Sequence, residues 1–271
     1  MKKRLSALIL AVLTATVTLT GCGSSSSENV FRVGMEAGYA PFNWTQLDDS
    51  NGAVKIDGSS EYAGGYDVEI AKKIADSLGK ELVIVKTEWD GLVPSLTSGK
   101  IDAIIAGMSP TEERKESIDF SDNYYKSELV MLVKKGGQYE NAETLSDFSG
   151  AKITGQLNTF HYSVIDQIPS VNKQPAMDNF SAMRVALETG VIDGYVTERP
   201  EALSAEMANE NFKMVEFKDG FVTSEEDTNT AVGLQKGSEL KDKINEVLNG
   251  ISDEERLEIM DEAIKNQPAA Q

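Results

Sequence analysis

The spacing of hydrophobic positions changes repeatedly along the chain from residue 30 onward. Short apolar runs of the length expected for buried strands occur at 30–35, 82–85, 101–106, 129–133, 151–154 and 192–196. Apolar residues at helical spacing occur at 66–78, 92–98, 180–189, 238–249 and 254–265. Because strand and helix patterns alternate, the sequence predicts α/β units around mostly parallel sheets.

Capping residues set the expected helix ends. The helix that follows Asp178 is expected to end at Gly190. The last helix opens with Ser252-Asp253-Glu254-Glu255, which is the pattern of a capping box. The inward face of this helix is expected to carry Leu257, Met260 and Ile264.

One pattern occurs twice. Residues 96–105 and 187–196 both read Leu-x-x-Gly-x-Ile-Asp, followed by a small and two apolar residues. In each copy a helix ends at a glycine and a buried strand follows. The repeat favours two α/β lobes with a ligand crevice at the carboxyl ends of their strands. The alternative is that the pattern only reflects how a helix turns into a strand.

The first residues have the character of a secretory leader. A basic start, Met1 to Arg4, precedes an apolar stretch at 5–19 that is too short to span a bilayer comfortably. The stretch ends in Leu19-Thr20-Gly21-Cys22, which resembles the lipobox of bacterial lipoproteins, whose cysteine is acylated after cleavage. We therefore expect residues 1–21 to be a signal peptide.

Cys22 is then the expected lipidation site, and two or more acyl chains on it give a stable membrane anchor. The alternative is a buried free cysteine. Residues 22–29 are rich in Gly and Ser and predict a flexible tether. The globular part is expected to begin near residue 30.

The charge balance excludes one class of partner. The chain has 26 Lys and Arg against 44 Asp and Glu, a net charge of −18. Nucleic-acid binding requires basic surface, so it is not expected. With 40% hydrophobic residues the chain is an ordinary globular protein, and its single Cys excludes an intrachain disulfide. Net charge acts on solubility and association rate and does not select a ligand.

Five segments resemble the polar amino-acid family of extracellular solute-binding proteins, which serve ABC importers. They are FRVGMEAGYAPF at 31–42, GYDVEIA at 65–71, WDGLVPSL at 89–96, GKIDAIIAGMSPTEER at 99–114 and DFSDNYY at 119–125. The segments occur in order, and the resemblance covers nearly the whole of the chain after the leader.

The resemblance implies a type II periplasmic-binding-protein fold, with two α/β lobes joined by two hinge strands near 125–127 and 229. Lobe 1 is expected at 30–125 plus 230–271, and lobe 2 at 126–229. The implied function is capture of a free amino acid and its delivery to a membrane permease. We expect a monomer, outside the cytoplasm, without cofactor or metal.

A zwitterionic ligand needs a cation for its carboxylate, and the resemblance assigns this role to Arg114. A guanidinium can donate two parallel hydrogen bonds to a carboxylate. Thr111 is a plausible helix cap beside it. The strand end at Gly107, Met108 and Ser109 completes the expected carboxylate site. The alternative is that Arg114 belongs only to a solvated helix face.

The ammonium of the ligand needs a carboxylate, and the match assigns Glu198. The family more often has Asp here, so the ligand is expected to sit deeper or the longer side chain to bend. Alternatively Glu198 is only the exposed start of a helix with Pro200 in its first turn.

Further ligand contacts follow from the resemblance. Aromatic walls are expected from Tyr39, Phe42 and Trp89, with Phe42 alternatively a core residue. In the lobe 2 loop, Asn158 stands where the family has Gly, and Phe160 where it has Thr. Contacts from that loop are expected at Gln156, Thr159 and Phe160.

Glu36 aligns with an acidic position that contacts the side chain of basic and amide ligands in the family. This favours Arg, Lys or His over Gln by a small margin.

Two other classes of protein are alternatives to an importer's binding protein. The same architecture hosts a few lyases, and Glu36 with Glu198 could form an acid-base pair. His161, the single His, is expected to be an exposed, incidental residue of the lobe 2 loop, and no cluster has metal-ligand spacing. A ligand sensor or surface-binding lipoprotein is the other alternative, although the absence of a fused signalling segment favours transport.

Overall fold

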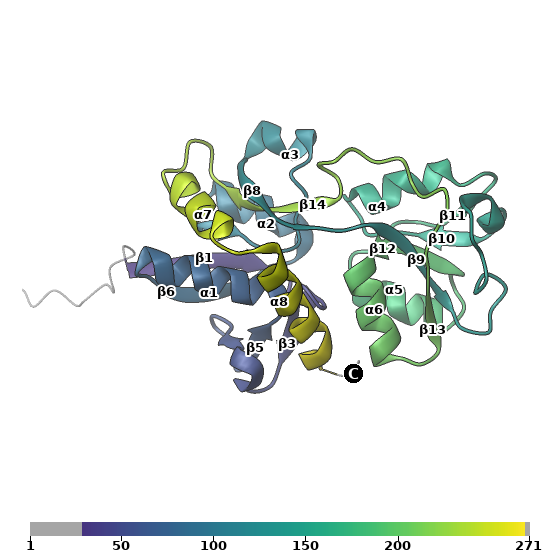
Figure 1. Ribbon diagram of the computed structural model, residues 1–271, viewed down its shortest axis with the longest axis horizontal. Coiled ribbons are helices and arrows are strands. Elements are labelled where there is room, and N and C mark those ends of the chain that lie inside the picture. Colours follow the sequence, from purple (N-terminus) through teal and green to yellow (C-terminus); the bar gives the residue numbers. More distant parts are fainter. Residues whose placement is uncertain (1–28, 269–271) are drawn as a thin grey trace, which may run out of the picture.

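The computed structural model describes residues 29–268, so the signal peptide 1–21, Cys22 and residues 22–28 of the tether lie outside the described residues. Two lobes lie side by side, joined by two strands that run between them (Figure 1). Each lobe contains one five-stranded sheet, with the orders β6-β1-β7-β14-β8 and β11-β10-β12-β9-β13. A small third sheet, β2-β3-β5-β4, extends the first lobe.

The elements of the first lobe come from both ends of the described chain. Its strands are β1 (Val30–Met35), β2 (Gly38–Tyr39), β3 (Asn43–Gln46), β4 (Val54–Lys55), β5 (Tyr62–Gly64), β6 (Glu81–Lys86), β7 (Ala103–Ile104), β8 (Asp119–Lys126) and β14 (Asn229–Leu234). Its helices are α1 (Tyr66–Leu78), α2 (Trp89–Thr97), α3 (Glu112–Ser117), α7 (Leu240–Asn249) and α8 (Asp253–Asn266).

The second lobe is formed by one continuous segment. Its strands are β9 (Leu129–Lys134), β10 (Lys152–Thr154), β11 (Asn172–Lys173), β12 (Gly194–Glu198) and β13 (Phe212–Val215). Its helices are α4 (Phe160–Ser163), α5 (Phe180–Glu188) and α6 (Arg199–Ala208).

The sheets are mixed. β1 pairs in parallel with β6 and β7, and β10 pairs in parallel with β11 and β12. The chain returns from the second lobe as β14, which pairs antiparallel with β7 and β8. Where the two connecting strands cross, the N–H of Ser127 donates to the carbonyl of Thr228 at 2.9 Å.

The repeated Leu-x-x-Gly-x-Ile-Asp pattern has a structural cause. Asp102 accepts the backbone N–H of Arg32 at 2.7 Å, where β1 begins. Asp193 accepts the backbone N–H of Lys152 at 2.8 Å, at the start of β10. In both lobes a carboxylate therefore fixes the start of a central parallel strand against the helix-to-strand turn.

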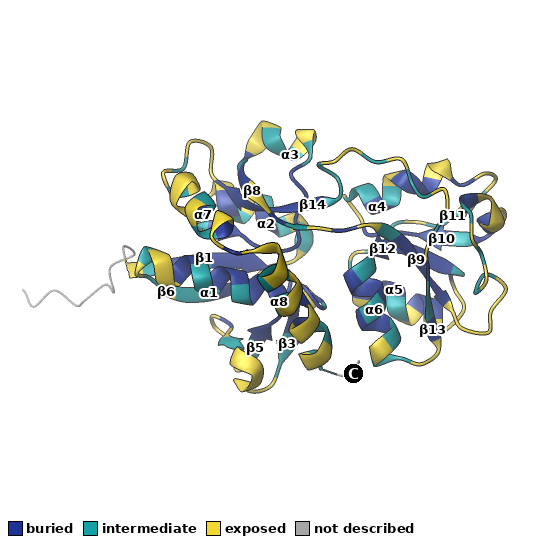
Figure 2. Ribbon diagram, viewed as in Figure 1, coloured by how far each residue is buried: buried dark blue, intermediate teal, exposed yellow. Residues whose placement is uncertain are grey.

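Each sheet packs its helices over a buried core (Figure 2). Helix α1 is typical: its apolar stripe of Val68, Ala71 and Ile74 is fully buried. The helix ends at Gly79, which adopts a φ of 64°, a conformation that glycine enters without steric cost. No helix within residues 29–268 has the length and apolar character needed to cross a membrane.

Several local predictions were wrong. Asn179, not Asp178, caps α5, by accepting the N–H of Ala182 at 2.9 Å. Leu257 is 59% exposed, whereas Met260 is buried as expected. The apolar run at 101–106 forms a strand only at Ala103–Ile104, and Gly107, which follows the run, adopts a φ of 61°.

Candidate functional site

The predicted site residues gather between the lobes, at the ends of strands. Glu36 follows β1, Gly107 to Ser109 follow β7, Gln156 follows β10, and Glu198 is the last residue of β12. Ligands of open α/β sheets bind at this edge of the strands. The segments of both lobes contact one another here.

Arg114 lies in α3, whose cap Thr111 accepts the Arg114 N–H at 3.4 Å. Its guanidinium donates to the carbonyl of Ser109 at 2.9 Å and, across the cleft, to that of Asn158 at 3.2 Å. Burial lowers its pKa to about 10, so the group stays charged at neutral pH. The guanidinium hydrogen-bonds to neutral carbonyls, while the negative charges of Glu113 and Asp227 partly offset the effect of burial on its pKa. An incoming carboxylate would pair with it directly.

Trp89 covers this guanidinium, with the Arg114 carbon 5.0 Å from the ring centroid. Asn158 lies opposite, with a φ of 56°, which explains how it occupies a position where the family has Gly. Its amide donates to Asp90 at 2.8 Å. The Ser109 hydroxyl, expected to grip the ligand carboxylate, donates instead to the carbonyl of Asp227 at 2.8 Å.

Tyr39 lies in a stack of aromatic rings. Its ring packs 4.9 Å from Phe42 on one side and 4.4 Å from Phe180 on the other. Phe42 is fully buried and also packs against Tyr66, so it supports Tyr39 from within the core. Gly107 must lack a side chain, since a Cβ there would lie 2.8 Å from the Tyr39 ring.

Phe180 falls in the helix expected at 180–189 and was not among the predicted ligand contacts, yet its ring packs against Tyr39 from the opposite lobe. A signal was available, because Phe180 is the first residue of a helix whose N-terminus faces the strand ends.

Gly107 and Met108 are held by the core. The N–H of Gly107 donates to the Tyr124 hydroxyl at 3.0 Å, and that hydroxyl donates to Asp67 at 2.7 Å. The carbonyl of Met108 accepts the N–H of Ala231 at 3.0 Å. These bonds fix the backbone that leads to Ser109.

Glu198 is 3% exposed and lies in contact with two groups. It accepts a hydrogen bond from the Tyr39 hydroxyl, and His161 Nε2 lies 3.0 Å from its Oε2. Burial alone would raise the pKa of Glu198, but His161 and Tyr39 outweigh this and hold it below its ordinary value. The expectation that His161 is exposed was wrong, because it is 5% exposed.

Thr159 and Phe160 support His161 from the same loop. Thr159 Oγ1 lies 3.2 Å from His161 Nδ1 and donates to the carbonyl of Gln156 at 2.8 Å. The Phe160 ring packs 4.3 Å from the imidazole. These side chains position the imidazole against Glu198.

Glu36 is bridged across the cleft by the amide of Gln156, whose nitrogen lies 3.2 and 3.4 Å from the two carboxylate oxygens. Burial raises the pKa of Glu36 to about 7, with the negative charges of Glu88 and Asp90 adding to the effect. A cation beside this carboxylate would restore its charged form.

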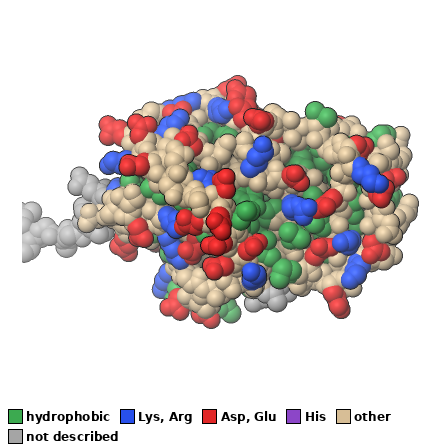
Figure 3. Space-filling view, in the orientation of Figure 1, with side chains coloured by type: hydrophobic (Ala, Val, Ile, Leu, Met, Phe, Trp, Pro, Cys, Tyr) green, Lys and Arg blue, Asp and Glu red, His purple; other side chains and the backbone are tan. Residues whose placement is uncertain are grey.

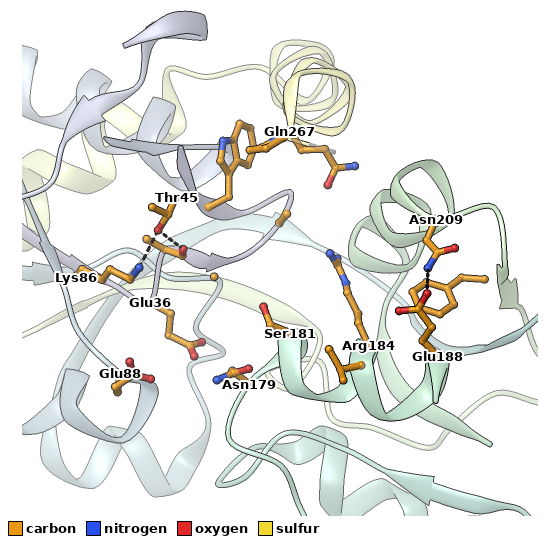
Figure 4. A pocket seen from close by; sticks show the side chains of 17 residues that line it. Glu36, Thr45, Lys86, Glu88, Asn179, Ser181, Arg184, Glu188, Asn209 and Gln267 are labelled. Atoms are coloured by element: carbon orange, nitrogen blue, oxygen red, sulfur yellow. Dashed lines mark hydrogen bonds between the residues drawn. The ribbon is translucent and has the colours of Figure 1, made fainter. Parts of the chain in front are cut away.

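A cavity of about 460 Å³ opens beside Glu36 (Figure 4). Glu36 and Glu88 line it from the first lobe, and Asn179, Ser181 and Arg184 from the second. The walls of the cavity carry charges of both signs, because Lys86 of the first lobe and Glu188 of the second also line it. Within residues 29–268 no group of three or more His, Cys, Asp or Glu side chains is placed to hold a metal ion.

The chain belongs to the bacterial extracellular solute-binding proteins, family 3, which match residues 31–264. The probable histidine-binding protein of Campylobacter jejuni is 33% identical over 75% of this chain and 80% of its own length. The arginine-binding extracellular protein ArtP of Bacillus subtilis is 28% identical over 95% of this chain and 96% of its own.

A solved structure agrees. An amino acid ABC transporter substrate-binding protein from Streptococcus pneumoniae, bound to L-arginine, superposes with a TM-score of 0.77 at 29% identity, covering 88% of this chain and 95% of that one. The predicted family and two-lobe fold are confirmed. The chain is a solute-binding protein and not an enzyme, which excludes the lyase alternative, and its family places it outside the cytoplasm.

Proposed function

We propose that this chain captures a free basic amino acid, arginine, lysine or histidine, in the cleft between its lobes and delivers it to the permease of an ABC importer. The observation that carries the proposal is the buried carboxylate of Glu36, which lines the cavity and forms no ion pair within residues 29–268. Its pKa is raised by burial and by the negative charges of Glu88 and Asp90. A guanidinium, ammonium or imidazolium at the end of a ligand side chain would supply that partner.

The other end of such a ligand has matching groups. The Arg114 guanidinium is available to its α-carboxylate, and the Glu198 carboxylate to its α-ammonium. Tyr39 and Trp89 supply aromatic surface on the first lobe. In the proposed cycle the ligand docks on the first lobe, and the second lobe closes with Gln156, Thr159, Phe160 and Glu198 by a hinge motion where Ser127 and Thr228 pair.

The relatives support an amino-acid ligand, since their names and bound ligand include histidine and arginine. On the face shown in Figure 3, Asp and Glu side chains lie interspersed with Lys and Arg side chains, so this face does not present the basic patch that nucleic-acid binding requires. We further propose that acylated Cys22 anchors the chain to the membrane and that the chain acts as a monomer. Metabolic labelling with palmitate, lost in Cys22→Ala, tests the anchor.

A thermal-shift screen of the chain from Ser24 against all twenty amino acids tests the ligand. The protein is first unfolded, dialysed and refolded to remove any bound ligand. A ligand present at a hundred times its Kd stabilises the native state by about 2.7 kcal/mol. We expect melting to rise with arginine, lysine or histidine.

A rise confined to glutamine or another neutral amino acid would contradict the role of Glu36. No rise with any of the twenty would contradict the amino-acid proposal itself. A sensor would bind equally well in this screen, so the importer is tested separately, by ligand uptake in cells that lack the chain.

A further inference from the structure

One buried group has no part in the proposed ligand contacts, the imidazole of His161. It lies in α4, is 5% exposed, and its Nε2 is 3.0 Å from Glu198 Oε2. At this distance the imidazole and the carboxylate form an ion pair when the ring is protonated. The direction of the N–H does not satisfy the geometry of a hydrogen bond. The contact is therefore a matter of charge rather than a fixed hydrogen bond.

Within residues 29–268, His161 is the group placed to bring a positive charge beside the Glu198 carboxylate. Packed around the imidazole are Phe160 on its own helix and Phe180 from α5, whose ring lies edge-on at 6.0 Å. Strand β2 contributes the Tyr39 hydroxyl, which also contacts Glu198. Glu201 of α6, another buried carboxylate of the second lobe, is paired with Arg184 at 2.8 Å.

We propose that His161 is a proton-dependent substitute for the α-ammonium of the ligand: its imidazolium neutralises Glu198 in the empty cleft, and the arriving ammonium replaces it. The inference rests on the proposed function. Because two cations beside one buried carboxylate repel each other, binding drives the proton from His161 Nε2 into solvent. The neutral ring then keeps its Nδ1 contact with Thr159.

The direction of the pH effect follows from this exchange. Where the empty protein holds the proton and the complex does not, raising the pH favours the complex, and affinity rises by up to about tenfold per pH unit. At higher pH, where the imidazole is neutral in both states, the dependence disappears. Imidazole is the side chain whose charge ordinarily changes between pH 5 and 8.

The pH dependence of affinity alone does not identify His161 as the group that loses the proton. Glu36 has a pKa of about 7, so binding of a cationic side chain beside it also becomes stronger as the pH rises. Calorimetry of L-arginine binding at pH 6, in buffers of different ionisation enthalpy, counts the protons released. We expect wild-type protein to release up to about one proton more than His161→Gln, which keeps a hydrogen-bonding side chain without the charge. Glu36→Gln is the matched variant and keeps the release due to His161.

A second measurement needs no variant, because His161 is the single histidine of the chain. In protein prepared without a histidine tag, its ring resonances report its charge directly by NMR. We expect an imidazolium at pH 6 in the empty protein and a neutral ring after saturation with L-arginine.

Binding with equal proton release in wild type and His161→Gln, or a ring whose charge state is the same with and without L-arginine, would overturn this inference and leave the proposed function intact. Failure of every amino acid to bind wild-type protein between pH 6 and 8 would instead overturn the proposed function. The two failures are therefore distinguishable.

Discussion

At the scale of single residues, the cleft holds charges that the protein itself compensates incompletely. Arg114 donates to carbonyls rather than to a carboxylate, and Glu36 accepts only a neutral amide. Burying such groups costs stability unless a counter-charge arrives. A zwitterion with a cationic side chain supplies both counter-charges. The cleft is therefore selective for such a ligand, because its own charges are not fully compensated without it.

The Arg114→Ala variant tests the carboxylate contact. It would leave the ligand carboxylate buried and unpaired, and we expect a loss of about 2 kcal/mol or more of binding free energy, roughly 30-fold in Kd for L-arginine. Arg114→Lys is the matched control, which keeps the charge without the planar fork and should lose less. Calorimetry measures both, and near-unchanged affinity in Arg114→Ala would contradict the assignment.

The Glu36→Gln variant is expected to raise the stability of the empty protein and to weaken ligand binding. The pKa of Glu36 is raised from 4.5 to about 7 in the folded protein, so the folded state binds this proton more tightly than the unfolded state and stability falls as pH rises through that window. We expect empty Glu36→Gln to be more stable than wild type at pH 8, by up to about 3 kcal/mol, and similar to it at pH 4.

The same Glu36→Gln variant should bind L-arginine more weakly at pH 8. Denaturant unfolding and calorimetry measure the two effects. Lower stability of the variant at pH 8 would show that ionised Glu36 is already compensated in the empty protein.

At the scale of elements, apolar runs predicted β1, β6 and β7 of the first five-stranded sheet and β9, β10 and β12 of the second, because burial of an apolar run is a local property. The same patterns did not predict β8, β11, β13 or β14, which complete the two sheets. Contacts across the cleft could not be predicted from such local patterns. Phe180 and His161 read as ordinary helix and loop residues, and only the approach of the second lobe brings them to Tyr39 and Glu198. The exposure of Leu257 likewise depends on how far α8 is covered by its neighbours.

The aspartate of the repeated pattern leads to a prediction about the stability of the two helix-to-strand turns. Removing Asp102 leaves the N–H of Arg32 without its acceptor, and removing Asp193 does the same to Lys152. We expect each Asp→Ala variant to lose about 1–3 kcal/mol of unfolding free energy. The control is Asp166→Ala, whose exposed pair with Lys173 should contribute under about 1 kcal/mol. Denaturant unfolding gives all three values, and equal stability of the three would refute the structural role.

At the scale of the whole molecule, the lobes meet through Tyr39 and Glu198, Glu36 and Gln156, and Arg114 and Asn158. Further contacts between the lobes lie outside this group. Asn158 bonds to Asp90, Lys115 pairs with Glu226 at 2.8 Å, and Gln267, just after α8, bonds to Ser204 of α6. A ligand shifts the open–closed equilibrium only by its greater affinity for the closed form, and about 5.5 kcal/mol is needed to move it from 1:99 to 99:1. Contacts that the empty protein makes on closing reduce what the ligand must supply.

Gln267→Ala tests this contribution. The variant removes the bond from the Ser204 hydroxyl and the one that Gln267 Nε2 donates to the Ser204 carbonyl at 2.9 Å. Because each of the two bonds contributes about 0.5–1.5 kcal/mol to the closed form, we expect affinity for L-arginine to fall by roughly 5-fold to at most about 150-fold. The inter-lobe distance of the empty protein, measured by fluorescence transfer between labels on the two lobes, should increase.

The control is Gln174→Ala, which removes an amide bonded to Asn172 within the second lobe. This variant should change neither the inter-lobe distance nor the affinity. If Gln267→Ala leaves both distance and affinity unchanged, the remaining contacts between the lobes hold the closed form without Gln267.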